Sequence, residues 1–322
     1  MRYVRLGKTD LEVSAIAFGT WAFGGDWGSF DAAESKGAIR HALDLGVTFF
    51  DTAQGYGFGV SERLLADALW DGARRDDVIL ATKGGLRMDG QTLLRDASAR
   101  WLRQGAESSL RNLRTDYIDL YQVHWPDPRT PPEETARVLE DLVQEGKVRH
   151  VGVSNYDDKQ MDELARYGRV ETLQPPYHMF HRDIEAQILP YTLEHEIGVL
   201  VYGPLSHGLL SGRMTPETTF PPDDWRSQSS DLTGKAFRQN LHVIERLKKY
   251  AAGHGITLPE LAVAWTISHP AVHVAIVGAR RASQLDGTLP AAEVSLSPQD
   301  RGEIARILSE SVPVIGPSPE GM

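Results

Sequence analysis

Short apolar runs alternate along the chain with longer segments whose apolar positions recur with the period of an amphipathic helix. The short runs are rich in Val, Ile, Tyr and Phe, a pattern typical of strands in repeated strand–helix units around a parallel sheet. We predict eight strands, with the sequences SAIAFGT, VTFFD, VILATK, IDLYQVH, VRHVGVS, VETLQ, GVLVYG and HVAIVG. The helices predicted between and after them cover Ala33–Leu45, Glu62–Trp70, Ser98–Leu113, Pro132–Glu145, Lys159–Arg166, Ile184–Glu194, Leu258–Ser268 and Pro298–Leu308.

Eight strand–helix units in 322 residues predict an α/β fold, the (β/α)8 TIM barrel, as a single domain over residues 1–322. A doubly wound sheet is the alternative, but it usually has fewer strands and a glycine fingerprint after its first strand. The segment FGTWAFGG contains glycines without the G-x-G-x-x-G spacing. We therefore favour the barrel.

Two segments lie outside this repeat. Met1–Val13, with LGKTD at its turn, is predicted to form an N-terminal β-hairpin that closes the bottom of the barrel. Met214–Thr233, rich in Pro, Asp, Ser and Thr, is predicted to be a long loop after the seventh strand, followed by an extra helix at Lys235–His254. Loops of this length are usually functional or mobile, and we expect Trp225 within it to cover the site or a cofactor.

The composition narrows the classes of partner. With 41% hydrophobic and 24% charged residues the chain is typical of a folded soluble protein, and its net charge of −10 argues against nucleic acid or an anionic membrane as the main partner. Because the chain has no cysteine, disulfides, thiolate metal sites and cysteine nucleophiles are excluded. No segment approaches the ~20 apolar residues needed to cross a bilayer, and MRYVRLGKTD does not resemble a signal peptide. We expect a cytoplasmic protein.

Ionisable residues end three successive predicted strands. These residues are Asp51, Lys83 and His124, and Tyr56 follows Asp51 in a glycine-rich loop. A carboxylate that ends an apolar strand is costly unless it is paired or solvated. Since catalytic groups of a (β/α)8 barrel lie at the carboxyl ends of its strands, we expect these side chains to meet at one site.

The four residue types suit proton transfer to an oxygen. The Lys83 ammonium would favour the phenolate of Tyr56 and lower its pKa from about 10, while Asp51 would keep the ammonium charged and oriented. A tyrosine tuned in this way exchanges a proton with a carbonyl or alcohol oxygen near neutral pH. A neutral His124 would donate a hydrogen bond to the same oxygen.

Each of the four residues also has a plain structural interpretation. Singly, Asp51 would be a solvated acid at the rim, Lys83 a surface residue, Tyr56 a half-buried packing aromatic and His124 a satisfied structural histidine. Their joint placement at neighbouring strand ends favours function.

The chain resembles the aldo-keto reductase superfamily, in particular its bacterial NADPH-dependent members and the branch of general stress proteins and potassium-channel β-subunits. The resemblance lies in LGKTDLEVSAIAFGTWAFGG, FFDTAQGYGFGVSERLLADAL, ATKGG, SLRNLRTDYIDLYQVHWPD, LVQEGKVRHVGVSN, LQPPYHMFHRDIE and AIVGARRASQL. It implies reversible reduction of aldehydes or ketones by NADPH, with Tyr56 as the general acid and base. Lys83 and Asp51 would tune that tyrosine, and His124 would orient the substrate. The implied substrate pocket comprises Trp21, Tyr56, His124 and Trp125.

The resemblance also implies the cofactor contacts. Ser154, Asn155 and Gln174 would hold the nicotinamide carboxamide, and Tyr202 would stack on the ring. The remaining implied contacts are Gly19, Thr20, Trp21 and Asp51 near the strand ends, Gly203, Pro204, Leu205, Leu210, Gly212 and Arg213 along the pyrophosphate, and Gly278, Ala279, Arg280, Gln284 and Thr288 at the adenosine end. Glycines let backbone N–H groups approach phosphates, and the last of these segments opens a helix whose N-terminus favours anions.

Some positions depart from the common pattern of the superfamily. Thr288 stands where many relatives have Asn, Gly203 replaces a frequent Ser, and His178 replaces a frequent Asn. We expect these changes to alter affinity or cofactor preference, not the type of reaction.

Two adjacent arginines bear on which cofactor is used. Arg280 and Arg281 would lie where a ribose 2′-phosphate binds, which favours NADPH over NADH. The alternative is that both are solvated residues at a helix start. His178 and His181 with Asp183 could form a metal cluster, but their loop-like spacing argues against one, so we expect no metal.

Two other classes of function stay open at this point. The chain could be a cofactor-sensing regulatory subunit, as the potassium-channel β-subunits are, or a barrel enzyme of different chemistry. Fold and motif do not establish turnover, although the complete set of four residues favours the enzyme. We expect a monomer or a weak homo-oligomer that acts on a small aldehyde or ketone.

Overall fold

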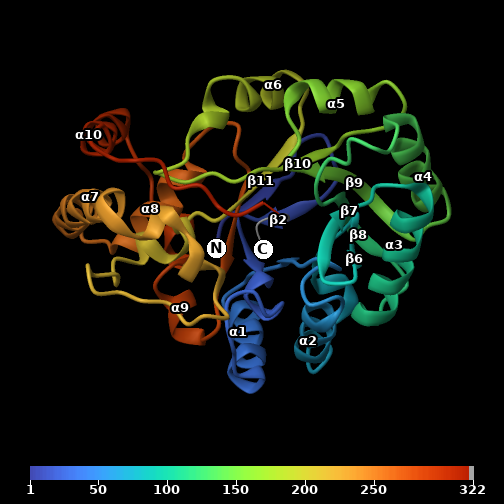
Figure 1. Ribbon diagram of the computed structural model, residues 1–322, viewed down its shortest axis with the longest axis horizontal. Helices are drawn as coiled ribbons and strands as arrows, with labels where there is room; N and C mark the ends of the chain where they lie inside the picture. The colour runs from blue at the N-terminus through green and yellow to red at the C-terminus, as the bar shows by residue number, and fades with distance from the viewer. Residues whose placement is uncertain (319–322) are drawn as a thin grey trace.

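Eight parallel strands form a closed barrel surrounded by helices (Figure 1). The computed structural model describes residues 1–318. The barrel strands are β3 (Ile16–Gly19), β4 (Phe49–Asp51), β5 (Ile79–Gly84), β8 (Ile118–Val123), β9 (Val148–Ser154), β10 (Thr172–Gln174), β11 (Gly198–Tyr202) and β12 (Val274–Gly278). Each strand pairs in parallel with the strands before and after it, and β12 pairs with β3 to close the ring. This confirms the predicted (β/α)8 barrel.

The helices lie close to the predicted segments. They are α1 (Ala32–Asp44), α2 (Val60–Leu69), α3 (Ala99–Leu113), α4 (Pro132–Gln144), α5 (Asp158–Ala165), α6 (Ile188–Glu194), α7 (Gly234–Gly253), α8 (Leu258–Ile267), α9 (Ala282–Asp286) and α10 (Pro298–Leu308). The sixth helix starts later than predicted, after a 3-10 turn at Asp183–Glu185. A helix running from Ile184 would have Pro190 in its interior, whereas the later start keeps Pro190 in the first turn, where a missing N–H costs nothing.

A hairpin of β1 (Tyr3–Arg5) and β2 (Glu12–Ser14) precedes the barrel, as predicted. Leu6 in its turn is fully buried, and the Lys8 N–H donates to the Glu196 carbonyl oxygen at 3.0 Å. Leu6 packs so closely on Gly198, at the start of β11, that a Cβ there would lie 2.8 Å from its Cγ. The hairpin therefore closes the end of the barrel where the strands begin.

The sequence analysis did not predict a second hairpin, which lies between β5 and α3. Its strands β6 (Leu86–Asp89) and β7 (Thr92–Arg95) pair antiparallel, with Gly90 at a φ of +62° in the turn. The dipeptide Asp-Gly is a strong hairpin signal, and Leu86–Asp89 alternates between apolar and polar residues, but Thr92–Arg95 does not.

The predicted long loop is folded against the loop that follows β3. It contains 3-10 turns at Trp225–Gln228 and Ser230–Leu232. An isolated antiparallel bridge joins Trp27 to Asp224, and the Trp225 N–H donates to the Asp26 carbonyl oxygen at 3.0 Å. After α10 the chain returns across the barrel end (Figure 1), where the Val314 N–H donates to the Phe180 carbonyl oxygen. The two loops and this segment therefore build up one end of the barrel.

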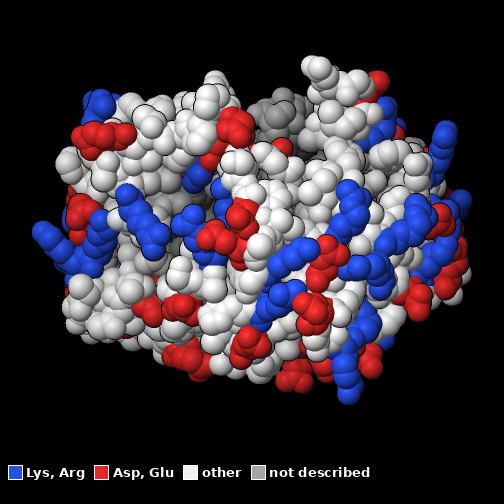
Figure 2. Space-filling view, turned by 90° about the horizontal axis from the view of Figure 1, so that it is seen from below, with Lys and Arg blue, Asp and Glu red and all other residues white. Residues whose placement is uncertain are grey.

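Charged side chains of both signs are interspersed over the face shown in Figure 2, and basic ones border a hollow toward its left. Within residues 1–318 no helix combines the length and apolarity that a membrane span requires.

The hairpin turn is tied to the barrel through His150 on β9. Its Nε2 lies 2.7 Å from Asp10 Oδ1 and its Nδ1 lies 3.0 Å from Glu171 Oε1. Burial opposes protonation of the ring, but the hydrogen bonds and charges of Glu171 and Asp10 outweigh it and raise the pKa of His150. Protonation of His150 therefore stabilises the folded state.

This stabilisation should depend on pH in a defined direction. It is complete below the unfolded pKa of about 6.5 and is lost as pH rises through the raised folded pKa. We expect His150→Gln to lower the free energy of unfolding by about 1 kcal/mol at most at acidic pH, because solvent screens the Asp10 side of the pair. The difference from wild type, measured by urea denaturation, should shrink above neutral pH. An equal difference at both pH values would contradict this role for His150.

A candidate active site at the carboxyl ends of the strands

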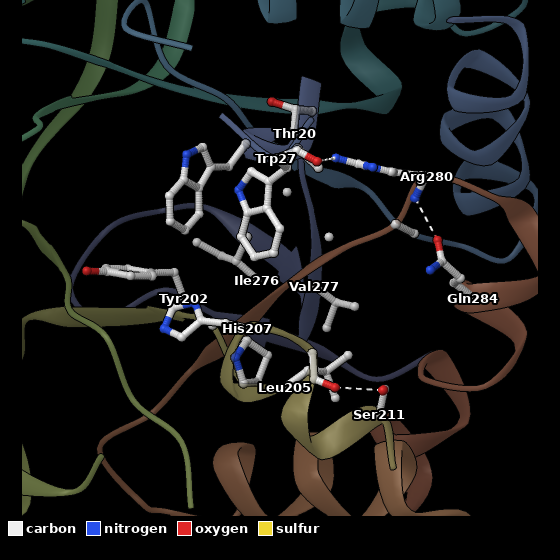
Figure 3. Close-up of a pocket in the computed structure, with 18 of the residues that line it drawn as sticks. Thr20, Trp27, Tyr202, Leu205, His207, Ser211, Ile276, Val277, Arg280 and Gln284 are labelled. Atoms are coloured by element: carbon white, nitrogen blue, oxygen red, sulfur yellow. Dashed lines mark hydrogen bonds between the residues drawn. The ribbon is translucent and has the colours of Figure 1, made fainter. Parts of the chain in front are cut away.

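A cavity of about 560 Å³ lies at the carboxyl ends of the barrel strands. Its volume is within the range of small-molecule and cofactor sites. Figure 3 shows part of its wall, with Tyr202 and Ile276 on neighbouring strands and Arg280 beyond them. The residues predicted for the site that line it are Gly19, Thr20, Trp21, Asp51, Tyr56, His124, Trp125, Ser154, Asn155, Gln174, Tyr202, Gly203, Pro204, Leu205, Arg213, Gly278, Ala279, Arg280, Gln284 and Thr288.

Three residues predicted for the site do not line the cavity. Lys83 is fully buried below its floor. Leu210 is also fully buried, and Gly212 ends the 3-10 segment Ser206–Ser211 with a φ of +69°. Leu210 and Gly212 flank Ser211, which does line the cavity.

Lys83 joins the ends of two neighbouring strands. Its ammonium donates to Asp51 Oδ1 at 2.6 Å, to the Thr52 carbonyl oxygen at 2.8 Å and to Tyr56 Oη at 3.4 Å. The parallel register of β4 and β5 places Asp51 opposite Ala81, so that Lys83 reaches past the end of β4. All three N–H donors of the ammonium are thereby used within the site.

The ion pair of Asp51 and Lys83 is buried. Burial raises the pKa of Asp51, and the Lys83 ammonium opposes that shift. Burial likewise lowers the pKa of Lys83, and the Asp51 carboxylate opposes it. Because removing either partner would leave an uncompensated charge in the interior, each keeps the other ionised.

The structure reverses one electrostatic expectation. Burial, followed by the negative charge of Asp51, raises the pKa of Tyr56 well above its ordinary value, whereas the sequence analysis expected Lys83 to lower it. The physical reason is burial, which disfavours the charged phenolate, together with the negative charge of Asp51. The Lys83 ammonium lies closer to Asp51, at 2.6 Å, than to the phenol, at 3.4 Å. Tyr56 is therefore held in its protonated form, ready to donate.

His124 follows β8 and faces Tyr56, with ring centroids 5.5 Å apart and planes at 78°. Burial, with a smaller contribution from the charge of Lys83, lowers the pKa of His124 well below 6.5. The imidazole is thus neutral near pH 7. Two neutral groups with labile protons, a phenol and an imidazole, meet at the cavity wall.

A chain of hydrogen bonds connects the ion pair to Tyr202. Gln174 Nε2 donates to Asp51 Oδ2 at 2.9 Å, and Ser154 Oγ donates to the Gln174 carbonyl oxygen at 2.8 Å. Asn155 Nδ2 donates to Ser154 Oγ at 3.0 Å, and Tyr202 Oη donates to Asn155 Oδ1 at 2.9 Å. The residues predicted to hold a nicotinamide are therefore fixed by one another. Sequence reasoning did not find the link from Gln174 to Asp51, because no local pattern signals it.

The turn after Leu205 has an unusual backbone. Ser206, His207 and Gly208 have φ values of +48°, +55° and +99°, a left-handed conformation that non-glycine residues adopt only at a cost. The N–H groups of Ser206 and Gly208 donate to the carbonyl oxygens of Gly203 and Leu205, at 2.8 Å and 3.0 Å, which holds the turn in this conformation. Ser206 Oγ is buried without a hydrogen-bond partner among the residues described. Arg213, nearby on the cavity wall, forms no ion pair within residues 1–318.

The two adjacent arginines do not act together as the sequence suggested. Arg280 lines the cavity and donates to the carbonyl oxygen of Trp27 (Figure 3). It also donates to the carbonyl oxygen of Ser29 and has no carboxylate partner in the described chain. Burial lowers the pKa of its guanidinium. Arg281 instead faces Glu34 on α1, with Nε 3.0 Å from Oε2, and does not line the cavity. The cavity wall therefore carries one of the two expected guanidinium groups, that of Arg280.

Sequence reasoning missed part of an aromatic cluster at the cavity. The Trp21 ring lies 5.0 Å from that of Trp27 and 6.1 Å from that of Trp225, and His207 lies 4.9 Å from Trp225. Burial, then the charge of Arg226, lowers the pKa of His207 to about 3, so this ring is also neutral. Trp27 lies in a loop and His207 in the short 3-10 segment Ser206–Ser211, and neither segment has a periodic pattern. The only sign of these two residues in the sequence is that an aromatic or titratable side chain stands next to a glycine.

In the part of the chain that the structure describes, no group of three or more His, Cys, Asp or Glu side chains is arranged to hold a metal ion. His178 and His181 face each other, with their rings 5.8 Å apart.

The chain is similar to proteins of known family. The model of the Aldo/keto reductase family matches residues 15–309. Aldo-keto reductase YhdN of Bacillus subtilis is 41% identical over 314 residues, covering 97% of this chain and 95% of that protein. The NADH-specific methylglyoxal reductase of Escherichia coli is 31% identical over 93% of this chain and 96% of its own length.

A probable voltage-gated potassium channel subunit beta of Arabidopsis thaliana is 33% identical, over 91% of this chain and 92% of that protein. Among solved structures, the glycerol dehydrogenase AKR11B4 from Gluconobacter oxydans superposes with a TM-score of 0.89 at 38% identity, covering 98% of each chain.

The raised pKa of Tyr56 can be tested by titration of the purified protein. We expect the difference in phenolate absorbance between wild type and Tyr56→Phe to stay at zero below about pH 10, because burial and Asp51 disfavour the phenolate. The variant serves as the reference for the other tyrosines. A difference signal with its midpoint below pH 9 would show that Lys83 controls the phenol, as the sequence analysis first supposed.

Proposed function

The chain belongs to the aldo/keto reductase family, and from this premise we propose that it reversibly reduces an aldehyde or ketone to the alcohol with NADPH, with Tyr56 as the proton donor. The observation that carries the proposal is the arrangement of the protonated Tyr56 phenol between the Lys83 ammonium at 3.4 Å and the neutral His124 ring. Both donors border a cavity that is large enough for a ligand.

Tyr56 and His124 would act on the same carbonyl oxygen. His124 donates a hydrogen bond that orients the carbonyl, and Tyr56 transfers its proton as negative charge develops on that oxygen. The nicotinamide, when bound, supplies the hydride. The ammonium of Lys83 then faces the tyrosinate, and Asp51 keeps that ammonium charged and in place. In the oxidative direction the tyrosinate would take the proton back.

The chain's own groups fit a nicotinamide dinucleotide. Ser154, Asn155 and Gln174 would hold the carboxamide. The pyrophosphate would lie along Gly203, Leu205 and Arg213, which line the same cavity. Arg280 would bind the ribose 2′-phosphate, since its guanidinium lacks a carboxylate partner within residues 1–318. This favours NADPH, while the NADH specificity named for the E. coli relative keeps NADH as the second candidate.

The substrate is proposed to be a small carbonyl compound. The site is walled by Trp21, Trp27, Tyr56 and His124, flat rings that leave room for a short or planar molecule. Two relatives are named for methylglyoxal and glycerol, which are three-carbon compounds. A cytoplasmic location and a monomeric or weakly associated state stay predictions from the sequence.

A regulatory role is the second candidate, favoured by the potassium channel β relative. A regulatory subunit of this kind would bind NADPH but reduce aldehydes very slowly. Turnover numbers with a panel of aldehydes, ketones, sugars and quinones, followed through nicotinamide absorbance, distinguish the two.

Tyr56→Phe tests the proton donor. The variant keeps the ring, and therefore its contacts with Trp21 and His124, but loses the proton. We expect turnover to fall by about 10²- to 10⁴-fold, while the dissociation constant for NADPH, measured by cofactor fluorescence, changes little. Turnover at the wild-type rate would assign the acid to another group.

Arg280→Ala tests the cofactor preference. Loss of a charge-assisted contact to the 2′-phosphate should raise the Michaelis constant for NADPH by roughly tenfold or more. Because Arg280 also holds the loop at Trp27 and Ser29, both cofactors should share a smaller loss. The ratio of the two effects is therefore the quantity to measure, and equal effects on NADPH and NADH would refute the phosphate role.

A further inference from the structure

Arg281 is held away from the cavity by an ion pair between two helices. Helix α1 packs beside α9, and two side-chain contacts join this region of the two helices. Glu34 Oε2 lies 3.0 Å from Arg281 Nε, and Asp286 Oδ1 lies 2.6 Å from His41 Nε2. Arg280, the residue before Arg281, lines the cavity. The two neighbouring arginines therefore point to different places. The Arg280 side chain lies on the cavity wall, and the Arg281 side chain is paired with Glu34 on α1.

Stability of the fold does not explain the pair of Glu34 and Arg281. The two side chains are 53% and 69% exposed, and ion pairs this exposed contribute little to folding. Arg281 can therefore readily leave Glu34 for a stronger hydrogen-bond acceptor. A ribose 2′-phosphate bound at Arg280 would carry about two negative charges and several acceptor oxygens within reach of the next arginine. A ribose 2′-hydroxyl, as in NADH, would offer no charge.

We propose that Glu34 sets the preference of this groove between NADPH and NADH. It holds Arg281 on α1, and its carboxylate competes with a 2′-phosphate for the Arg281 guanidinium. The inference rests on the proposed function, because it requires that the groove bind a nicotinamide dinucleotide. Both effects of Glu34 weaken binding of NADPH and leave binding of NADH almost unchanged. The preference of the groove for NADPH is therefore smaller than it would be without Glu34.

Other charged groups around Arg280 come from the facing loop. Asp224 there is paired with Arg226 at 2.6 Å, and the charge of Asp223 also acts on Arg280. Neither carboxylate forms an ion pair with Arg280 or Arg281 in the described structure. Glu34 is the acid that withdraws an arginine from the site, and this singles it out for substitution.

The test measures dissociation constants for NADPH and NADH by titrating cofactor fluorescence with purified protein at low ionic strength, where exposed charges act fully. We expect Glu34→Gln to tighten NADPH binding by roughly three- to tenfold and to change NADH binding by less than about twofold. Asp286→Asn is the matched control, because it removes one carboxylate from the same helix pair, opposite His41. It should leave the ratio of the two constants unchanged.

A double substitution separates the role of Arg281 from a general effect of charge. Arg281→Ala alone should alter NADPH binding by less than about twofold, since Glu34 already occupies that side chain. In the Glu34→Gln background the same substitution should remove most of the gain. Persistence of the whole gain, or an equal gain in Asp286→Asn, would overturn the proposal. If the wild-type protein bound neither cofactor, the proposed function would fail and this inference with it.

Discussion

The buried contact between Lys83 and Asp51 is the interaction on which the rest of the site depends. Two charges are removed from water, and only their 2.6 Å separation and the surrounding hydrogen bonds offset that cost. The barrel makes this contact possible because β4 and β5 end side by side. Tyr56 and Gln174 are then positioned by the two partners, one on each side. The geometry of the candidate site thus follows from one ion pair at the floor of the cavity.

The barrel and the strand-end residues could be predicted because both depend on local pattern and parallel topology. Apolar runs of strand length mark the barrel strands, and parallel strands bring their carboxyl ends to one edge. Asp51, Lys83 and His124 follow from that rule alone. The hairpin β6–β7 was missed because β7, with two adjacent leucines, does not alternate in polarity. Helix α6 begins at Ile188, later than the periodicity of the sequence predicts, because Pro190 is tolerated only in the first turn.

The rest of the site depends on distances that a sequence does not contain. The direction of the pKa shift of Tyr56 depends on how deeply the phenol is buried and on the charge of Asp51 beside it. The orientation of Arg281 depends on Glu34, which lies 247 residues earlier in the chain. In the same way, Trp27 and Trp225 meet only because two loops without periodic pattern pack together. Residue types were predictable, but the partners that tune them were not.

The bridge between Trp27 and Asp224 makes two distant loops one structural unit. Arg226 lies over the Trp27 ring, and Arg280 binds the carbonyl oxygens of Trp27 and Ser29, so a third segment is attached to the same unit. Neither loop can change its length without shifting the other. Grafting a foreign loop in place of residues 214–233 would therefore require its matching partner in place of residues 21–30. The two segments would have to be transplanted together as one cassette.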